Sequence, residues 1–244
     1  NTSWYQETLN TPTRGSRREF PSVALIVATT TTVTIYDADD PALPMWMVFE
    51  GVIGGSSIGS SSVRAITALN GEMTVATNGA SNDYQSGLPR VRFIKDLYSV
   101  NRGSILDDYF VGDGQILNRN VTPLGSLYAT GQRLVSGYIN DVAMTVLAGA
   151  PIDAATGIAV PTIAVATAGG VSVIKDDGSV SDHSLALPYQ GISFIGDRLF
   201  FGTENAQMRF ADKSLWEVDG FSQTGAYRYL HSSSGTFPVI NTST

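Results

Sequence analysis

The fold of this chain is decided by a short unit whose clearest copy reads Val165-Ala166-Thr167-Ala168-Gly169-Gly170-Val171-Ser172-Val173-Ile174-Lys175-Asp176. In this unit an apolar residue, a small residue and a threonine lead into a turn, and alternating apolar residues then lead to an aspartate. Three further copies begin at Val27, Val75 and Phe201. Internal repetition of this kind usually decides the architecture before any single motif does.

The spacing of the copies predicts a propeller-like fold. The copies begin at residues 27, 75, 165 and 201, which gives a unit of roughly 36 to 48 residues, close to a four-stranded propeller blade. The longest gap predicts a degenerate unit between residues 115 and 137. We therefore expect an all-β, β-propeller-like repeat of about four or five four-stranded antiparallel blades, in a complete or a partial ring. A β-sandwich is the alternative, and it explains the strands but not the repeat.

Turn sequences between the apolar runs support hairpins. Asn70-Gly71 joins two such runs, and Asn-Gly is a strong hairpin signal because both residues tolerate a positive φ. Gly196-Asp197 joins two more runs in the same way. The segment 23–28 is apolar throughout, which predicts an inner strand that is buried on both faces.

The composition limits the classes of function. The chain has 244 residues, of which 43% are hydrophobic and only 15% are charged, with a formal net charge of −7. An acidic chain lacks the basic face that direct nucleic-acid contact needs, and no apolar run is long enough for a membrane span. Cysteine is absent, which excludes disulfides and cysteine-based metal sites. We expect no cofactor.

The first 20 residues differ from the rest because they are polar and aperiodic. We therefore divide the chain into an extended N-terminal arm, 1–20, and a β-propeller-like domain, 21–244. Three arginines and two aromatic residues in the arm predict an interface with an acidic neighbouring subunit. They are Trp4, Tyr5, Arg14, Arg17 and Arg18. A solvated tail explains the same sequence equally well.

No residue pattern indicates a catalytic or metal site. Carboxylates cluster at three places, where they could face a sugar in a glycosidase or bind calcium, but aspartates in hairpin turns more often form the turn itself. The clusters are Asp37/Asp39/Asp40, Asp107/Asp108 and Asp176/Asp177. Of the two histidines, His183 follows a hairpin and is expected to be exposed, and His231 precedes a polar tail.

Two irregular stretches, 78–90 and 99–125, are candidate receptor-facing loops. Aromatic faces in such loops can stack on sugars or close an interface, and burial within the loops is the alternative. The candidate residues are Asn82, Asp83, Tyr84, Tyr109 and Phe110.

Several blocks of the sequence resemble structural proteins of tailed bacteriophages from marine environments, which include tail, tail-fibre and nozzle-like proteins. The blocks are Thr11–Pro21, Val33–Asp37 with Leu43–Phe49, and Val160–Thr167 continued by Lys175–Gly178. The resemblance carries no catalytic motif. It implies a non-enzymatic virion structural protein of the tail, such as a nozzle, hub or fibre-attachment component. Such a protein would assemble as a homo-oligomer with other tail subunits.

Two other functions stay open at this point. A receptor-binding tail module would recognise host surface glycans through the irregular loops. An enzyme such as a depolymerase would need two or more acidic groups facing one cleft.

Overall fold

The computed structural model describes residues 2–29, 32–50, 62–78, 87–103, 109–111, 115–120, 127–129, 133–184, 188–203, 207–217 and 230–231. At 109–111, 127–129 and 230–231 it describes the backbone alone.

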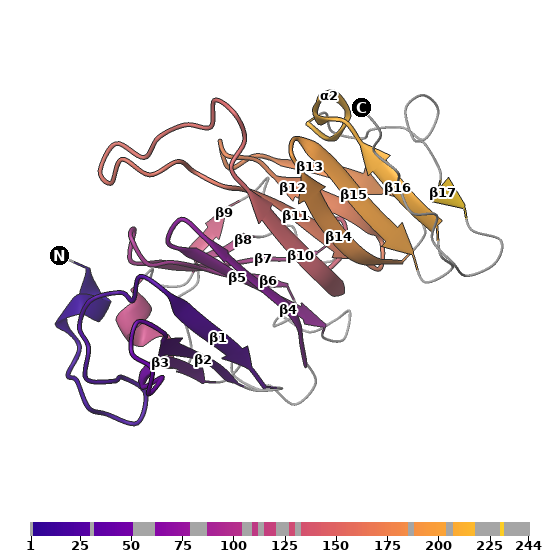
Figure 1. Ribbon diagram of the computed structural model, residues 1–244. Helices are drawn as coiled ribbons and strands as arrows, with labels where there is room; N and C mark the ends of the chain where they lie inside the picture. Colours follow the sequence, from indigo (N-terminus) through magenta and orange to yellow (C-terminus); the bar gives the residue numbers. More distant parts are fainter. Residues whose placement is uncertain are drawn as a thin grey trace.

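The described chain forms four antiparallel sheets that follow one another in sequence (Figure 1). Sheet 1 contains β1 (Ala24–Ala28), β2 (Thr32–Asp37) and β3 (Met45–Glu50). Sheet 2 contains β4 (Ser62–Leu69), β5 (Glu72–Asn78), β6 (Leu88–Arg92), β7 (Leu97–Asn101), β8 (Tyr109–Val111) and β9 (Leu127–Ala129). Sheet 3 contains β10 (Ile139–Thr145), β11 (Thr162–Thr167), β12 (Gly170–Ile174) and β13 (Val180–Ser184). Sheet 4 contains β14 (Tyr189–Ile195), β15 (Arg198–Thr203), β16 (Gln207–Ala211) and β17 (Leu230–His231).

Among the described residues, three short helical turns lie outside the sheets: η1 (Ser3–Gln6), η2 (Ile116–Asn118) and α2 (Lys213–Trp216). In the part of the chain that the structure describes, no helix is long and apolar enough to cross a membrane.

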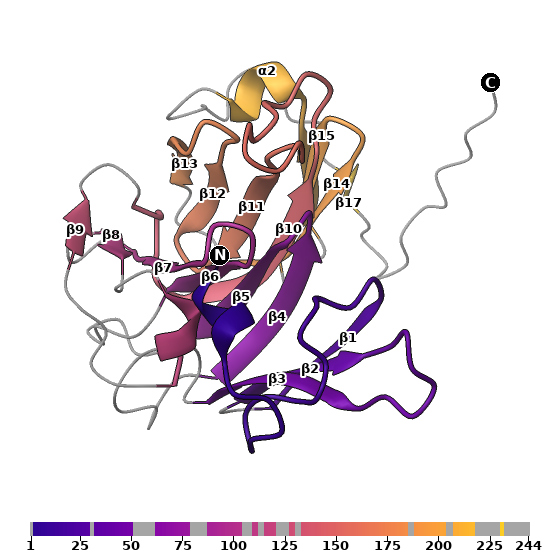
Figure 2. The ribbon, with the colours of Figure 1, turned by 90° about the vertical axis from the view of Figure 1, so that its left-hand side faces the viewer.

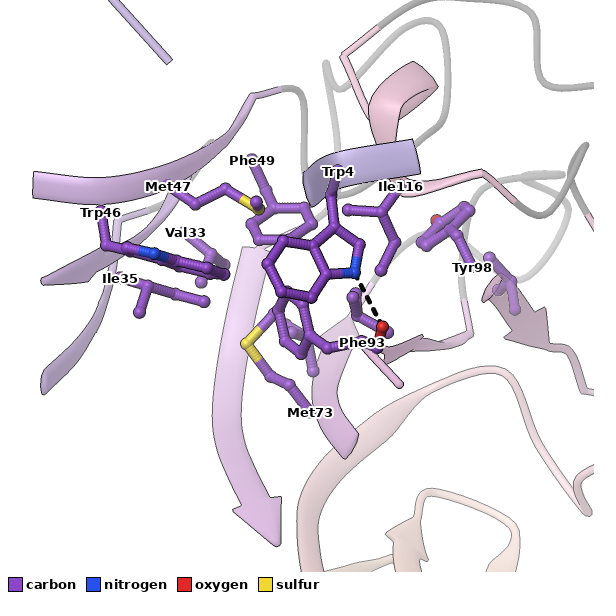
Figure 3. Packing of buried hydrophobic residues seen from close by; sticks show 13 residues of the cluster. Trp4, Val33, Ile35, Trp46, Met47, Phe49, Met73, Phe93, Tyr98 and Ile116 are labelled. Carbon is purple, nitrogen blue, oxygen red and sulfur yellow. Dashed lines mark hydrogen bonds between the residues drawn. The ribbon is translucent and has the colours of Figure 1, made fainter. Parts of the chain in front are cut away.

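Each sheet packs face to face on the next, and a separate apolar cluster fills each contact. The cluster between sheets 1 and 2 is rich in aromatic rings (Figure 3), as is the cluster between sheets 3 and 4, whereas the cluster between sheets 2 and 3 is aliphatic. Representative members are Trp46, Phe49 and Phe93 in the first, Leu88, Ile139 and Val165 in the second, and Tyr189, Phe201 and Trp216 in the third. Removal of this apolar surface from water is the main force that holds the sheets together.

In three of the four copies of the repeated unit, the threonine bonds to backbone groups where its strand ends. The Thr167 hydroxyl donates a hydrogen bond to the Gly170 carbonyl at 2.9 Å and accepts one from the Gly169 N–H at 3.2 Å. Equivalent bonds join the Thr77 hydroxyl to the Gly87 carbonyl at 2.7 Å and the Thr32 N–H to the Thr29 hydroxyl at 3.0 Å. The threonine thus satisfies backbone polar groups at the turn.

A β-bulge recurs in the first strand of sheets 2, 3 and 4. In each strand one extra residue stands between the partner of the motif threonine and the partner of the small residue before it. The extra residues are Arg64, Asn140 and Gln190. Beside the bulge of sheet 3, the Asn140 amide donates to the Tyr189 carbonyl at 2.7 Å, and the Asp141 carboxylate accepts the Ile192 N–H at 2.9 Å. This bulge therefore links sheet 3 directly to the first strand of sheet 4.

The structure confirms the all-β prediction and the hairpin signals. Asn70 and Gly71 have φ values of 51° and 71°, as an Asn-Gly hairpin turn requires. Sheets 3 and 4 have four strands, whereas sheet 1 has three and sheet 2 has six. The described sheets do not close into a ring, and sheets 1 and 4 lie at opposite ends of the molecule (Figure 1 and, in the turned view, Figure 2). Pairs of neighbouring sheets pack as in a β-sandwich.

Two expectations about individual segments are wrong. The degenerate unit at 115–137 does not form a sheet of its own in the described residues, because β9 pairs with β8 and extends sheet 2. The segment 23–28 is not buried on both faces. Its strand, β1, is an edge strand in which Leu25 and Val27 are 44% and 41% exposed, because sheet 2 covers only the opposite face.

Replacing Thr167 with valine keeps the shape of the side chain but removes both hydroxyl hydrogen bonds. Since the bond to the Gly170 carbonyl is buried, we expect the free energy of unfolding to fall by about 1 to 3 kcal/mol. Urea denaturation measures this loss. The matched control is Thr29→Val, at an exposed copy of the same position, where water replaces the lost bonds. Equal losses in the two variants would contradict the burial argument.

Candidate functional site

The N-terminal segment lies against sheet 1 and forms part of the fold rather than an extended arm. The Gly15 N–H donates to the Trp46 carbonyl at 3.0 Å, and the Val48 N–H donates to the Thr13 carbonyl at 2.9 Å. The segment therefore covers the open edge of β3. Gly15 permits this approach, because a Cβ at this position would lie 1.8 Å from the Met45 carbonyl oxygen.

Two of the five predicted interface residues are buried within their own chain. Trp4 is 7% exposed, and its indole N–H donates to the Phe93 carbonyl at 2.7 Å (Figure 3). Arg14 is 1% exposed. Tyr5 and Arg18 lie nearer the surface, with the Arg18 guanidinium 5.7 Å from the Tyr5 ring centroid. The interface with a neighbouring subunit stays a prediction, and the buried Trp4 and Arg14 are not accessible to a partner.

A buried ion network fixes this segment. Glu7 lies between two arginines: its Oε2 is 3.3 Å from the Arg14 Nε, and its Oε1 contacts the Arg119 Nη1. Arg14 also donates to the Trp46 carbonyl at 2.8 Å, with its guanidinium 4.5 Å from the Trp46 ring centroid. Burial lowers the pKa of Arg14 to about 10, so it keeps its charge at neutral pH. The network joins the N-terminus to residues far along the chain.

The fifth predicted interface residue, Arg17, holds the turn after β2. Its Nη1 lies 2.8 Å from Asp37 and 2.7 Å from Asp39. Asp39 also accepts the N–H groups of Ser22 and Val23 at 2.8 and 3.0 Å. The pKa of Asp39 is lowered, first by the Ser22 N–H and then by Arg17. These contacts confirm that Asp37 and Asp39 form a turn, and they occupy the oxygens that a calcium ion would need.

A polar cleft of about 310 Å³ lies between sheets 2 and 3. The loop between β10 and β11 forms one wall and is joined to sheet 2 by two contacts. Lys95 and Asp153 form an ion pair at 3.0 Å, and the Asn70 amide donates to the Ala159 carbonyl at 2.9 Å. The cleft is therefore bounded by two sheets that are tied together at its rim.

The charges that line the cleft balance one another. Four are positive and four are negative: Arg90, Arg92, Lys95 and Lys175, and Glu72, Asp153, Asp176 and Asp177. Arg90 and Glu72 form a buried pair at 2.6 Å. This lining suits a polar ligand without a strong net charge, because a charged ligand would compete with the Arg90–Glu72 and Lys95–Asp153 ion pairs.

Two carboxylates of the cleft, Asp153 and Asp177, lack the raised pKa that a general acid needs at neutral pH. The pKa of Asp153 is lowered, chiefly by its hydrogen bond with Lys95, and the pKa of Asp177 is lowered by the Ser179 hydroxyl. A general acid at neutral pH needs the opposite shift. Within the described ranges, no group of three or more His, Cys, Asp or Glu residues could hold a metal ion.

The remaining candidates lie elsewhere. His183 is 2% exposed, with its ring centroid 6.3 Å from that of Phe201, so the expectation of an exposed histidine is wrong. Asn82, Asp83 and Tyr84 lie outside the described residues, as do Asp107 and Asp108. Tyr109 and Phe110 belong to β8, of which the backbone alone is described. The receptor-facing loop therefore stays a prediction.

No protein-family model matches the chain. No curated protein matches it in sequence either. Several solved structures show a weak likeness to the chain, among them Ika8, PorZ and Hsv2p. The computationally designed Ika8 protein is 11% identical with a TM-score of 0.38, and the match covers 80% of this chain and 57% of that one. PorZ is a bacterial surface component of the type-IX secretion system of Porphyromonas gingivalis. It is 13% identical with a TM-score of 0.36, over 88% of this chain and 28% of that one.

The third structure is Hsv2p of Kluyveromyces lactis, which is 12% identical with a TM-score of 0.31, over 79% of this chain and 72% of that one. The chain thus spans little more than half the length of Ika8 and less than a third of that of PorZ. At these TM-scores the likenesses assign neither a closed fold nor a function.

Some important residues gave no usable signal in the sequence. Glu7 and Arg119 meet across 112 positions, and no local pattern relates them. The sequence does contain a signal for the cleft. Arg90 and Arg92 alternate with apolar residues in a strand that is almost wholly buried. Such cations inside a sheet require polar partners.

Glu7→Gln tests the buried ion network. The change keeps the size of the side chain but leaves two buried arginines without their carboxylate. We expect a loss of about 3 to 5 kcal/mol in the free energy of unfolding, measured by urea denaturation. The control is Glu217→Gln, which removes an ion pair with Lys213 whose side chains are 41% and 34% exposed, and which should cost about 1 kcal/mol or less. Similar losses in both variants would contradict the network.

The turn after β2 predicts a dependence of stability on acid pH. The pKa of Asp39 lies below its ordinary value of 3.8 in the fold, so its contribution is present above that value and is lost as pH falls through the folded pKa. Asp39→Asn should therefore flatten the decline of the unfolding free energy below about pH 4. Urea denaturation across a pH series measures the slope. An unchanged slope in Asp39→Asn would exclude this role.

Proposed function

We propose that the protein is a non-enzymatic structural component of a bacteriophage virion, that it belongs to the tail, and that it acts through protein–protein assembly. The observation that carries the proposal is apolar surface at both ends of the row of sheets. Leu25 and Val27 of sheet 1 are 44% and 41% exposed, and Ile195 of sheet 4 is 65% exposed. Adjacent exposed apolar side chains on a sheet face favour contact with another protein.

The sequence blocks that resemble phage structural proteins support the proposal. They fall on the N-terminal segment, on β2 and β3 and on β11, which build the sheets and their contacts. Within the tail, a nozzle, hub or fibre-attachment position fits a protein that presents two apolar ends. The net charge of −7 argues against direct contact with the genome.

The sheets themselves fit a propeller-like ring, of which this chain would form a part. They follow one another in chain order, and the first strands β4, β10 and β14 pack in succession against one another. Innermost strands of propeller blades pack in this way around an axis.

The tail assignment is tested on purified particles of the phage that encodes the chain. We expect mass spectrometry to detect the chain in several copies per virion, and labelled antibodies to place it at the tail in electron micrographs. Virions that lack the chain would overturn the assignment.

A receptor-binding module that recognises host surface glycans is the second candidate, and the polar cleft between sheets 2 and 3 is the observation that favours it. Its amide and paired charges could bind sugar hydroxyls without a charged ligand. A ligand there would lie beside Lys95, which is 48% exposed and pairs with Asp153 at the rim.

A glycan array with the purified protein tests this candidate. If a glycan binds in the cleft, Lys95→Ala should weaken binding about tenfold or more, because a hydrogen bond to a charged group is lost. Lys213→Ala is the matched control, since Lys213 also forms an exposed ion pair, with Glu217 at 3.4 Å, but in a helix outside the cleft. Absence of any bound glycan would count against this function.

A further inference from the structure

Comparison of the four copies of the repeat shows that sheet 1 lacks one strand. In sheets 2, 3 and 4 the motif triplet lies on the second strand, which pairs with the bulged first strand on one side. In sheet 1 the triplet lies at the end of β1, and within the described ranges β1 pairs with β2 alone. Strands β1 to β3 therefore correspond to the second, third and fourth strands of the other sheets.

The contacts between sheets support the same alignment. β10 packs against β5, the second strand of the preceding sheet, and β14 packs against β11, again a second strand. β4 packs against β1, so β1 takes the place of a second strand here as well. The first strand that would complete sheet 1 is not among the described strands.

Equivalent side chains in sheet 1 and in the other three sheets differ in how far they are exposed to solvent. In the second strand, the first residue of the triplet and the residue two positions before it point toward the preceding sheet, because alternate residues face opposite sides. In sheets 2 to 4 these residues are at most 1% exposed: Met73 and Val75, Ile163 and Val165, Leu199 and Phe201. In sheet 1 they are Leu25 and Val27, at 44% and 41%. Sheet 1 is thus patterned for a preceding sheet.

The other end of the row shows the complementary feature. Phe200 alternates with Leu199 and Phe201, which pack on sheet 3, so Phe200 lies on the far face of sheet 4. Its ring centroid is 5.6 Å from that of Phe210. Ile195 pairs with Arg198 on the same face and is 65% exposed. Sheet 4 therefore carries apolar side chains on the face that a following sheet would cover, beside the exposed Arg198–Asp212 ion pair at 2.7 Å.

We infer that a second copy of this chain docks head to tail, with the far face of sheet 4 in one copy packed on the Leu25 and Val27 face of sheet 1 in the other. This inference rests on the proposed assembly role and names its partner. The new contact continues the sheet-to-sheet packing that already exists three times within one chain. A head-to-tail contact closes into a ring or continues as a filament, and two copies would bring eight sheets together, within the usual range of propellers.

The test measures the mass of the full chain in solution by native mass spectrometry and light scattering, over a range of protein concentrations. We expect wild type to form a dimer or a larger assembly. The double variant Leu25→Asp/Val27→Asp and the single variant Ile195→Asp should each have the mass of one chain, because a carboxylate would be buried in the contact. Ile152→Asp is the control, since Ile152 is 59% exposed but lies in the loop between β10 and β11.

Circular dichroism distinguishes loss of contact from loss of fold, and all three variants should keep the wild-type spectrum because the replaced side chains are exposed. Mixing the double variant with Ile195→Asp tests the head-to-tail geometry. The mixture retains one intact sheet 4 face and one intact sheet 1 face, so it should form a heterodimer that neither variant forms alone.

Three results would overturn the inference: a wild-type chain that is monomeric at every concentration, an assembly that survives both end variants, or a mixture that does not form the heterodimer. If the two faces instead bind some other protein or a terminal segment of the same chain, the wild-type chain will be monomeric at every concentration. A monomer that is found in virions would overturn this inference and leave the tail assignment standing. A head-to-tail assembly that is absent from virions would overturn the tail assignment and leave this inference standing.

Discussion

The middle sheets of this protein bury both faces, because each has a neighbouring sheet on either side. All six residues of β11 are buried, and six of the seven in β5 are buried. The motif meets the requirement for two buried faces with a larger residue toward one neighbour and a small one toward the other, as with Val75 and Ala76. Sheets 2 and 3 have both neighbours within the chain. Sheets 1 and 4 each have one, and apolar side chains such as Val27 and Ile195 stay exposed on their outer faces.

The edges of the sheets are governed by a second requirement, because an unpaired strand edge invites association with other chains. At β3 the N-terminal segment covers the edge, and Glu7 holds it there through Arg14 and Arg119. The Glu7 carboxylate and its two arginine partners are buried together, so the N-terminal segment is held firmly on this edge. At β1 no described strand does the same. Within the described residues, the two edges of sheet 1 thus differ, since one is covered and the other is not.

Much of the fold could be predicted because its determinants are local. The repeat and the Asn70-Gly71 turn marked the strands and hairpins, and aspartates such as Asp39 were recognised as turn residues. The contact between Glu7 and Arg119 could not be predicted, since it joins positions 112 apart that share no pattern. Val27 and Val165 have the same sequence environment but opposite exposure. The difference in exposure between Val27 and Val165 depends on how whole sheets are arranged, and a local sequence pattern does not contain that information.

The contact between sheets 2 and 3 differs from the other two contacts in the side chains that form it. Its cluster is aliphatic, and polar residues such as Thr74 and Ser99 are buried near it. Aromatic clusters lie on either side, within the pair formed by sheets 1 and 2 and within the pair formed by sheets 3 and 4. The boundary between these two pairs also holds the polar cleft, and the Lys95–Asp153 ion pair and the Asn70–Ala159 hydrogen bond join the pairs at its rim. The one sheet contact without aromatic rings is therefore the one where polar side chains lie beside the apolar cluster.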